Sequence, residues 1–335
     1  MKKIRWGVLS TAKIGVEKVI PAMQRGDLTE VVAIASRSDE KARKAAETLG
    51  LARSHGSYEA LLADPEVDAI YNPLPNDGHV PWSIRALEAG KHVLCEKPIG
   101  LSAAEGRKLA DVAAGFPKLK LMEAFMYRHH PQWRLAKQVV DSGKIGTLKT
   151  IQTFFSFFND DPRNIRHDPA MGGGGMLDIG CYAVSLSRFL FGGEPRRAFG
   201  HVEIHPEWSV DRMASAVLDF GDGGSATFTC SMAVSPLQVV HVVGTSGRIE
   251  LADVPFNAPN NRPCVVLTQV GDGAIERTEV ETCDQYTIQG DLFAKAILED
   301  TPVPTPILDA IRNMDAIEAV FASGRSGGWV VPNAT

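Results

Sequence analysis

The first third of the chain alternates short apolar runs with segments whose apolar residues recur every three or four positions. The runs are rich in β-branched side chains, which is typical of buried strands, whereas the wider spacing is typical of helices that pack by one face. The predicted strands are residues 4–10, 31–36, 69–73, 92–96 and 119–124, and the predicted helices are 14–25, 39–49, 58–63, 80–89 and 103–113. Strands and helices that alternate in this way predict a doubly wound parallel sheet.

Residues at the ends of these segments agree with the periodicity. Ser38 precedes the second predicted helix, and Ser102 with Glu105 forms a capping-box pattern before the fifth. Gly50 and Gly90 stand where two helices are predicted to end, as C-terminal glycines do.

After about residue 124 the pattern changes to β-like runs separated by glycine-rich turns. The predicted strands are 148–158, 196–204, 213–220, 225–230, 239–243, 248–251, 265–270 and 276–281, and the predicted helices are 132–142, a helix opened by the glycines at 172–175 and running to 190, 288–299 and 307–323. Turn signals at 221–224, 245–247 and 271–273 suit antiparallel hairpins. We therefore predict an α/β protein: a doubly wound parallel sheet in residues 1–124, and an α+β domain with a large, mainly antiparallel sheet in residues 125–335.

Length and composition agree with two folded domains. The chain has 335 residues, whereas one domain typically has about 100 to 200. Its 44% hydrophobic and 22% charged residues are ordinary for a globular protein. The 35 Lys and Arg against 40 Asp and Glu give a net charge of −5, and no dense basic run interleaves with aromatic residues. A direct role on DNA or RNA is therefore not expected.

The N-terminal residues predict a strand rather than a leader. The apolar stretch after Met1-Lys2-Lys3 is broken at Arg5 and Gly7, which a signal peptide would not be. No segment approaches the roughly 18 unbroken apolar residues of a membrane span. We expect a soluble, cytoplasmic protein.

The cysteines and histidines do not predict a metal site. The cysteines are scattered and lack the short paired spacings of a zinc site; they are Cys95, Cys181, Cys230, Cys264 and Cys283. The histidines do not pair with other ligands at metal spacing, except for the adjacent His129 and His130, whose side chains diverge on most backbones. We expect reduced, mostly structural thiols and no metal.

The turn after the first strand is a candidate dinucleotide site. A full fingerprint would place glycines at positions 10, 12 and 15, where this chain has Ser10, Ala12 and Gly15. Small side chains let backbone N–H groups and a helix N-terminus approach a pyrophosphate, although a merely tight turn would use them too. The candidate contacts in this turn are Ser10, Thr11, Ala12, Lys13 and Ile14.

The end of the second strand distinguishes between the two nicotinamide cofactors. An acidic residue here would bind the adenosine ribose of NAD, whereas this chain has Ser36-Arg37-Ser38 with Lys41 one turn into the helix. These groups suit the 2′-phosphate of NADP. The alternative interpretation is that Arg37 is simply a solvent-exposed arginine at the start of a helix and binds no phosphate. We predict NADP.

Two further segments carry candidate chemistry at the carboxyl ends of later strands. Residues 72–79 read as a rigid loop, and Glu96-Lys97 precedes Pro98, which we expect to be cis. The Glu-Lys pair lies where the nicotinamide ring must lie in such a sheet.

The glycine run at 172–175 precedes Asp178 and Tyr182, which are four residues apart and so share one face of a helix. A lone Tyr at helical spacing is usually a core residue. Paired with Asp178 behind glycines that allow close approach, Tyr182 is the best candidate for a general acid or base.

With these motifs in place, the whole chain resembles the glucose-fructose oxidoreductase, inositol dehydrogenase and rhizopine-catabolism (Gfo/Idh/MocA) family. The resemblance rests on the small-residue turn, Glu96-Lys97-Pro98, residues 128–131, residues 164–169, and Asp178 with Tyr182. Many relatives carry His where Tyr182 stands. Tyr is similar to the branch that contains aldose-aldose oxidoreductase, glucose-fructose oxidoreductase, NADP-dependent xylose dehydrogenase and dimeric dihydrodiol dehydrogenase.

The resemblance implies a Rossmann domain and a second domain whose open sheet face commonly packs against another subunit, giving a homodimer or homotetramer. It implies adenosine contacts from Ser36, Arg37, Lys41 and Tyr58, nicotinamide-side contacts from Asn72, Leu74, Asn76, His79, Glu96 and Lys97, and a cofactor contact from Arg166. The implied substrate contacts are Lys97, Glu123, Phe158, Asp178 and Tyr182.

The activity implied is hydride transfer between C1 of a cyclic aldose and NADP, giving an aldonolactone. Tyr182 would take the proton of the anomeric hydroxyl, Lys97 would favour the phenolate, and Asp178 would bind a neighbouring sugar hydroxyl. Four alternatives stay open: recycling of a retained NADP between two aldoses, a xylose or glucose dehydrogenase with exchangeable cofactor, a trans-dihydrodiol dehydrogenase, and a non-catalytic sensor. Four aromatic residues either stack on the substrate or belong to the core: Phe125, Tyr127, Trp133 and Phe158.

Overall fold

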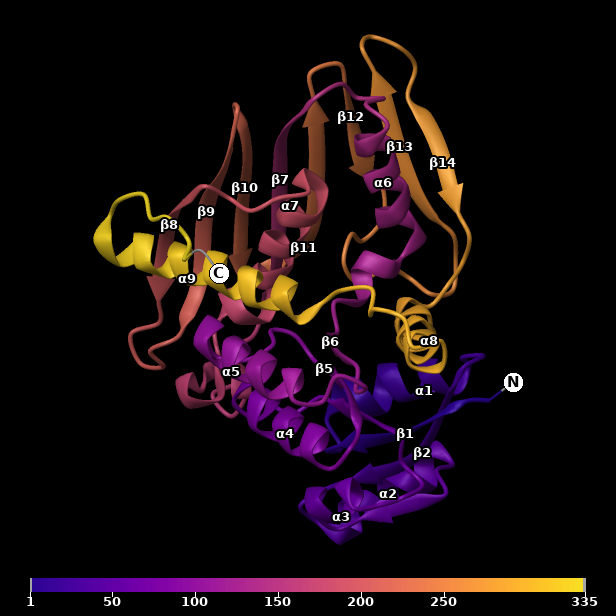
Figure 1. Ribbon diagram of the computed structural model, residues 1–335. Coiled ribbons are helices and arrows are strands. Elements are labelled where there is room, and N and C mark those ends of the chain that lie inside the picture. The colour runs from indigo at the N-terminus through magenta and orange to yellow at the C-terminus, as the bar shows by residue number, and fades with distance from the viewer. Residues whose placement is uncertain (1, 334–335) are drawn as a thin grey trace. The chain divides into compact units, whose positions relative to one another are not determined.

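The N-terminal residues form a six-stranded parallel sheet in the order β3-β2-β1-β4-β5-β6 (Figure 1). A computed structural model describes residues 2–333. The strands are β1 (Ile4–Leu9), β2 (Thr29–Ala35), β3 (Arg53–His55), β4 (Ala69–Asn72), β5 (His92–Cys95) and β6 (Leu121–Glu123). The helices between them are η1 (Gly15–Val19), α1 (Ile20–Gln24), α2 (Asp39–Leu49), α3 (Tyr58–Leu62), α4 (Asn76–Glu88) and α5 (Ala103–Ala114). The predicted doubly wound parallel sheet is confirmed.

The capping signals read from the sequence are present. Ser38 Oγ accepts from the backbone N–H of Lys41, 3.3 Å away, and Ser102 Oγ accepts from that of Glu105 at 3.2 Å. The Glu105 carboxylate also accepts from the backbone N–H of Leu101 at 2.8 Å, so it satisfies a second donor at this helix start. Gly50 ends α2 in the left-handed conformation at φ 66°.

Two elements of this sheet differ from the sequence expectation. Strand β3 was not predicted, because Arg53, Ser54 and His55 carry no apolar signal. Helix α4 begins at Asn76, so the last residues of the expected 72–79 loop form its first turn. The apolar spacing that revealed this helix begins only at Val80, and a polar first turn gives no such signal.

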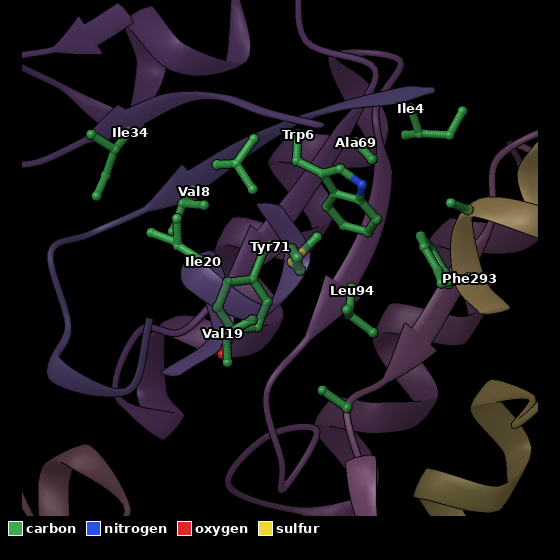
Figure 2. Close-up of a cluster of buried hydrophobic side chains, with 14 of the residues drawn as sticks. Ile4, Trp6, Val8, Val19, Ile20, Ile34, Ala69, Tyr71, Leu94 and Phe293 are labelled. Carbon is green, nitrogen blue, oxygen red and sulfur yellow. The ribbon is translucent and has the colours of Figure 1, made fainter. Parts of the chain in front are cut away.

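The core of this sheet includes a helix from late in the chain. Trp6 of β1 is fully buried, and its ring centroid lies 5.5 Å from that of Phe293 on α8 (Gln285–Leu298) (Figure 2). The Asp291 carboxylate of the same helix accepts from the backbone N–H of Leu28 at 2.9 Å. By its contacts the chain divides into two units, one comprising the described residues up to Met126 with Asp284–Ile311, and the other Tyr127–Cys283 with the described residues from Arg312 on.

The second unit contains an eight-stranded sheet in the order β14-β13-β12-β11-β7-β10-β9-β8 (Figure 1). The strands are β7 (Leu148–Phe158), β8 (Arg197–Ile204), β9 (Asp211–Gly221), β10 (Gly224–Ser231), β11 (Ala233–Gly244), β12 (Gly247–Leu251), β13 (Cys264–Val270) and β14 (Glu276–Val280). Every pair is antiparallel except β7 with β10. This confirms the large, mainly antiparallel sheet, and the three predicted hairpin turns join β9 to β10, β11 to β12 and β13 to β14.

Helices accompany this sheet and carry the candidate chemistry. They are α6 (Pro131–Asp141), η5 (Met176–Gly180), α7 (Cys181–Phe191) and α9 (Ile307–Ser326), and η5 runs directly into α7. α7 packs on β7, and α6 packs on β13. Among the helices described, none is long and apolar enough to span a bilayer.

Candidate active site

The turn after β1 adopts the shape that a dinucleotide turn needs without its glycines. Ser10 lies in the left-handed region at φ 71°, a conformation that L side chains seldom adopt. Its hydroxyl oxygen accepts from the backbone N–H of Ala12, 3.2 Å away, and this local bond helps to hold the conformation. Gly15 has ordinary room, because a Cβ there would lie 3.6 Å from the nearest atom of Pro73. The small residues at 10 and 12 therefore shape the turn more than Gly15 does.

The adenosine-side candidates gather at the carboxyl end of β2. Ser36 is buried, and its hydroxyl accepts from the backbone N–H of Ser38 at 3.3 Å. Burial raises the pKa of Tyr58, and the neighbouring Arg37 cation partly offsets that rise. The Tyr58 ring makes an edge contact with Trp82 at a centroid distance of 4.9 Å. Arg37 and Tyr58 are therefore neighbours, as the resemblance implies.

A basic hollow lies between the dinucleotide turn and α2. It has a volume of about 370 Å³, and its lining includes Lys13, Lys41 and Lys44 with Thr11 and Thr48, and also Glu17, whose carboxylate lies 3.9 Å from the Lys13 ammonium. Cations and hydroxyls are the groups that bind phosphate, so the donors present fit the extra phosphate of NADP. Lys44 was not among the sequence candidates. Its spacing of three residues from Lys41 on a helix was the available signal.

The Glu96-Lys97 segment follows β5 and is held by hydrogen bonds within the first unit. The Tyr71 hydroxyl donates to Glu96 Oε1 at 2.7 Å, and the Lys97 backbone N–H donates to Glu96 Oε2 at 3.3 Å. The Lys97–Pro98 peptide bond is cis, as expected. The Glu96 carboxylate thus accepts hydrogen bonds from its own loop and from β4.

His79 and Asn72 lie inside the first unit and bind backbone. The ring nitrogens of His79 lie 2.7 Å from the carbonyl oxygen of Pro98 and 2.8 Å from that of Leu74. Burial lowers the pKa of His79 to about 4, so the ring is neutral near pH 7 and donates to one of the two carbonyls. The Asn72 amide donates to the carbonyl oxygen of His79 at 3.0 Å and accepts from the backbone N–H of Leu74 at 3.3 Å. These contacts make both residues supports of the loop beside Lys97.

Arg166 and Asp178 form an ion pair in the second unit. Arg166 Nε donates to Asp178 Oδ2 at 2.6 Å and its terminal nitrogen to Oδ1 at 3.2 Å, which is the two-pronged geometry that favours arginine with carboxylate. The Asp178 charge is the largest cause of the raised pKa of Arg166, and Tyr182 also contributes. The structure therefore brings together three candidates predicted from the sequence: Asp178 on η5, Tyr182 on α7, and Arg166 in the segment before the glycine run.

Tyr182 is buried, at 6% exposure, within an aromatic cluster. Its ring centroid is 5.2 Å from that of Phe256, 5.7 Å from Tyr127 and 5.8 Å from Phe155. The Tyr127 hydroxyl is 2.8 Å from Ser185 Oγ, so it is bonded within the core. The cluster fixes the plane of the Tyr182 ring, because each neighbour is itself packed.

The aromatic residues that the sequence left open divide into two kinds. Phe125, Tyr127 and Trp133 are 1% exposed or less and belong to the core. Phe158, at the end of β7, is 60% exposed, which suits a group that stacks on a ligand. Glu123, on β6, is 1% exposed.

Comparison with known proteins decides the family. Residues 4–123 match the model described as "Oxidoreductase family, NAD-binding Rossmann fold", and residues 133–250 match that of the GFO/IDH/MocA C-terminal domain. The chain belongs to the Gfo/Idh/MocA family of oxidoreductases. This confirms the resemblance drawn from Glu96-Lys97-Pro98 and from Asp178 with Tyr182.

Several members of this family match almost the whole chain. The NADP-dependent D-xylose 1-dehydrogenase 2 of Haloferax volcanii is 38% identical over 328 residues, which cover 97% of this chain and 98% of that protein. The structure of KijD10, a 3-ketoreductase from Actinomadura kijaniata, with NADP and TDP-benzene has a TM-score of 0.89 at 32% identity, covering 96% of this chain and 98% of that one. Aldose-aldose oxidoreductase from Caulobacter crescentus has a TM-score of 0.90 at 25% identity, covering 98% of this chain and 100% of that one. The NADP named for the first two agrees with the cofactor predicted from Ser36-Arg37-Ser38.

Proposed function

We propose that the protein is an NADP-dependent oxidoreductase that transfers a hydride between C1 of a cyclic aldose and the nicotinamide, with an aldonolactone as the oxidised product. The observation that carries the proposal is the 38% identity with an NADP-dependent D-xylose dehydrogenase over 97% of the chain. A match of that length includes the nucleotide-side residues of the first unit and the Asp178–Tyr182 helix of the second.

The basic hollow between the dinucleotide turn and α2 supports NADP as the cofactor. Lys13, Lys41 and Lys44 would hold the 2′-phosphate, with Ser36 as a hydrogen-bonding neighbour and Arg37 against the adenine. When bound, NADP supplies the nicotinamide carbon that accepts or returns the hydride. The protein residues bind this cofactor and handle the proton.

Tyr182 is proposed to take the proton of the anomeric hydroxyl. In oxidation the O–H bond at C1 breaks and its proton would pass to the Tyr182 phenolate oxygen. The C1–H bond breaks as well, its hydrogen leaves with both electrons as the hydride that NADP would accept, and C1 becomes the lactone carbonyl. A phenol with a pKa near 10 is a poor base at neutral pH, so a neighbouring cation must favour the phenolate. We assign that role to Lys97. The Arg166–Asp178 pair then places a carboxylate that accepts from a neighbouring sugar hydroxyl, with Phe158 as a further substrate contact. Glu123 is only 1% exposed, so no substrate contact is assigned to it.

Paired variants test the assignment of Tyr182 and Lys97. We expect Tyr182→Phe and Lys97→Ala each to lower kcat for xylose or glucose by about two to four orders of magnitude, because each removes part of one proton transfer. NADP binding, measured by fluorescence titration, stays within about threefold, a threshold of roughly 0.65 kcal/mol. If both groups serve one step, the kcat of the double variant is only slightly lower than that of the less active single variant. Near-normal turnover in either single variant would contradict the assignment.

Retention of the cofactor is a second candidate feature of the function. The similarity to an aldose-aldose oxidoreductase motivates a test of whether bound NADP is recycled between two sugars. In that case the protein purified without added cofactor already contains NADP, and glucose alone reduces it. If the cofactor exchanges freely, the protein purifies empty and added NADP is reduced by the aldose. Turnover only with trans-dihydrodiols or only with nucleotide-linked keto sugars would assign the function to those substrate classes. Absence of turnover with every substrate tested would favour a non-catalytic sensor.

The exposed apolar residues of the large sheet support a homo-oligomer. Phe199 is 36% exposed, Ile204 51% and Leu237 48%, on β8 and β11. We propose that this sheet face packs against a second copy of the chain. Light scattering after gel filtration tests this, and a monomer at micromolar concentration would contradict it.

A further inference from the structure

The helix that carries Asp178 and Tyr182 begins without a cap of its own. Its first residue is Met176, and the residue before it, Gly175, has no side chain that could bond the free backbone N–H groups. Free N–H groups at a buried helix start need partners from elsewhere. At this helix the partner comes from Asp211, 35 residues later in the chain.

Asp211 is the first residue of β9 and is 3% exposed. Its Oδ2 accepts from the backbone N–H of Met176 at 2.6 Å, and the N–H of Gly175 also faces the carboxylate. No lysine or arginine forms an ion pair with Asp211 among residues 2–333. The carboxylate is thus held by backbone N–H groups and by the positive end of a helix.

The glycine run is shaped around this carboxylate. A Cβ on Gly174 would lie 2.1 Å from Asp211 Oδ1, and Gly174 has φ +110°, so a side chain is excluded on both grounds. The Gly174 N–H donates to the carbonyl oxygen of Arg166 at 2.9 Å, and a Cβ on Gly173 would lie 2.4 Å from that same oxygen. Asp211 therefore fixes the start of the helix, and the same glycines connect that start to the segment of Arg166.

We propose that Asp211 is a positioning residue, which holds the helix start so that Asp178 and Tyr182 are correctly placed for the reaction. The inference rests on the proposed function. It assigns Asp211 an effect on the rate of the chemical step and little on NADP affinity, since the residues proposed to hold the 2′-phosphate belong to the other unit.

The ionised form of Asp211 is the one that suits this role. Both oxygens of a carboxylate accept hydrogen bonds, whereas a protonated acid or an amide has a donor in place of one acceptor. Burial, with the charge of Asp178 as a smaller contribution, raises the pKa of Asp211 to about 7, and the N–H groups of Met176 and Gly175 oppose the rise. The adjacent Arg212 is hydrogen-bonded to Glu203, and burial raises the pKa of the nearby Cys230 thiol, so that thiol is neutral.

The test compares Asp211→Asn and Asp211→Ala with a control on the same strand. Asp219→Asn is that control, because the Asp219 carboxylate binds Arg197 and the Gly221 N–H at the far end of β9. The measurements are kcat and KM for the aldose, the Kd of NADP, and backbone hydrogen exchange of the peptide spanning 173–182. We expect Asp211→Asn to lower kcat by about tenfold or more, a barrier change of about 1.4 kcal/mol. The Kd of NADP should differ from that of the wild type by less than about twofold.

Hydrogen exchange separates the failure of this inference from the failure of the proposed function. We expect exchange in 173–182 to rise in Asp211→Asn and Asp211→Ala and to stay unchanged in Asp219→Asn, whether or not the aldose is a substrate. Unchanged exchange in both Asp211 variants would overturn the inference. So would raised exchange with wild-type kcat on whichever substrate the protein turns over. If the wild-type protein oxidises no aldose while exchange responds as expected, the substrate proposal fails and the positioning of the helix start stands.

Discussion

The two units hold their candidate residues in different ways. In the first unit the phosphate-side lysines are exposed to solvent and line an open hollow, where Lys13 also pairs with Glu17. In the second unit Asp178 is bonded to Arg166, Tyr182 is packed against aromatic rings, and Asp211 is buried under the helix start. Exposed charges contribute in small, salt-dependent steps, whereas the effects of groups that share one hydrogen-bonded or packed network are coupled. The difference suggests that affinity for NADP is distributed over several groups and that the chemical step depends on a few.

Among the variants that test this difference between the units, Asp178→Asn is expected to have the largest effect. Asp178→Asn removes the charge that holds Arg166, so we expect kcat to fall by about two orders of magnitude or more, as loss of a positioned acid-base partner typically does. The Kd of NADP changes little, because the phosphate-side lysines are untouched. Steady-state kinetics and fluorescence titration measure the two quantities.

The matched control for this variant is Arg163→Ala. Arg163 and Asp161 form an exposed ion pair in the same segment as Arg166. We expect wild-type kcat for Arg163→Ala. Equal losses in Asp178→Asn and Arg163→Ala would mean that the segment, and not the Arg166–Asp178 pair, controls the rate.

An effect on stability is expected from the titration of Asp211. Its pKa is raised to about 7 in the folded protein from an ordinary value of 3.8. A raised pKa means that the folded state binds the proton more tightly, so the stabilising contribution is fully present below the unfolded pKa and is lost as the pH rises through about 7. Between pH 5 and 8 the wild-type protein should lose roughly 2 to 3 kcal/mol relative to Asp211→Asn, which does not titrate there.

Thermal melting of wild type and Asp211→Asn at several pH values tests this expectation. The melting temperatures should move apart in favour of the variant as the pH rises. Parallel curves would show that Asp211 is not destabilised by ionisation. Together with a lower kcat in the variant, the expected result would make Asp211 a group whose ionised form costs stability and serves the reaction.

The smallest effect is expected on the Kd of NADP when one of the phosphate-side lysines of the first unit is removed. Lys41→Ala removes one of several cations around the 2′-phosphate, so the Kd of NADP should rise by about tenfold, or 1.4 kcal/mol, with the Kd of NAD unchanged. Added salt should weaken NADP binding less in the variant, because one charge interaction is already absent. Isothermal titration at two salt concentrations measures both effects.

Lys18→Ala is the control for this experiment. Lys18 is an exposed lysine on η1 that does not line the hollow. It should bind NADP as the wild type does. A Kd for NAD that rises together with that for NADP in Lys41→Ala would place Lys41 away from the 2′-phosphate.

The sequence predicted what is encoded locally. The strands β1, β2, β4, β5 and β6, the caps at Ser38 and Ser102, and the cis bond before Pro98 are set by residues close together in the chain. The dinucleotide turn belongs to this class too, because Ser10 and Ala12 interact over two positions. The closing helix α8 was also visible as a helix, although nothing in its periodicity tells that Phe293 packs on Trp6.

Features that depend on distant partners could not be predicted. The importance of Asp211 lies in a bond to Met176, and its own neighbours in the sequence give no sign of it. The parallel pairing of β7 with β10 joins strands separated by η5, α7, β8 and β9. The motif Asp178-x-x-x-Tyr182 marked a candidate site, whereas the ion pair with Arg166 could be seen only in the folded chain.

The most direct test of the proposed function is the absorbance of reduced nicotinamide when the purified protein meets xylose or glucose, with NADP and with NAD in parallel. We predict that an aldose reduces NADP, either the added cofactor or cofactor already bound, far faster than it reduces NAD. No reduction with any aldose, or equal rates with the two cofactors, would contradict the proposal of an NADP-dependent aldose oxidoreductase.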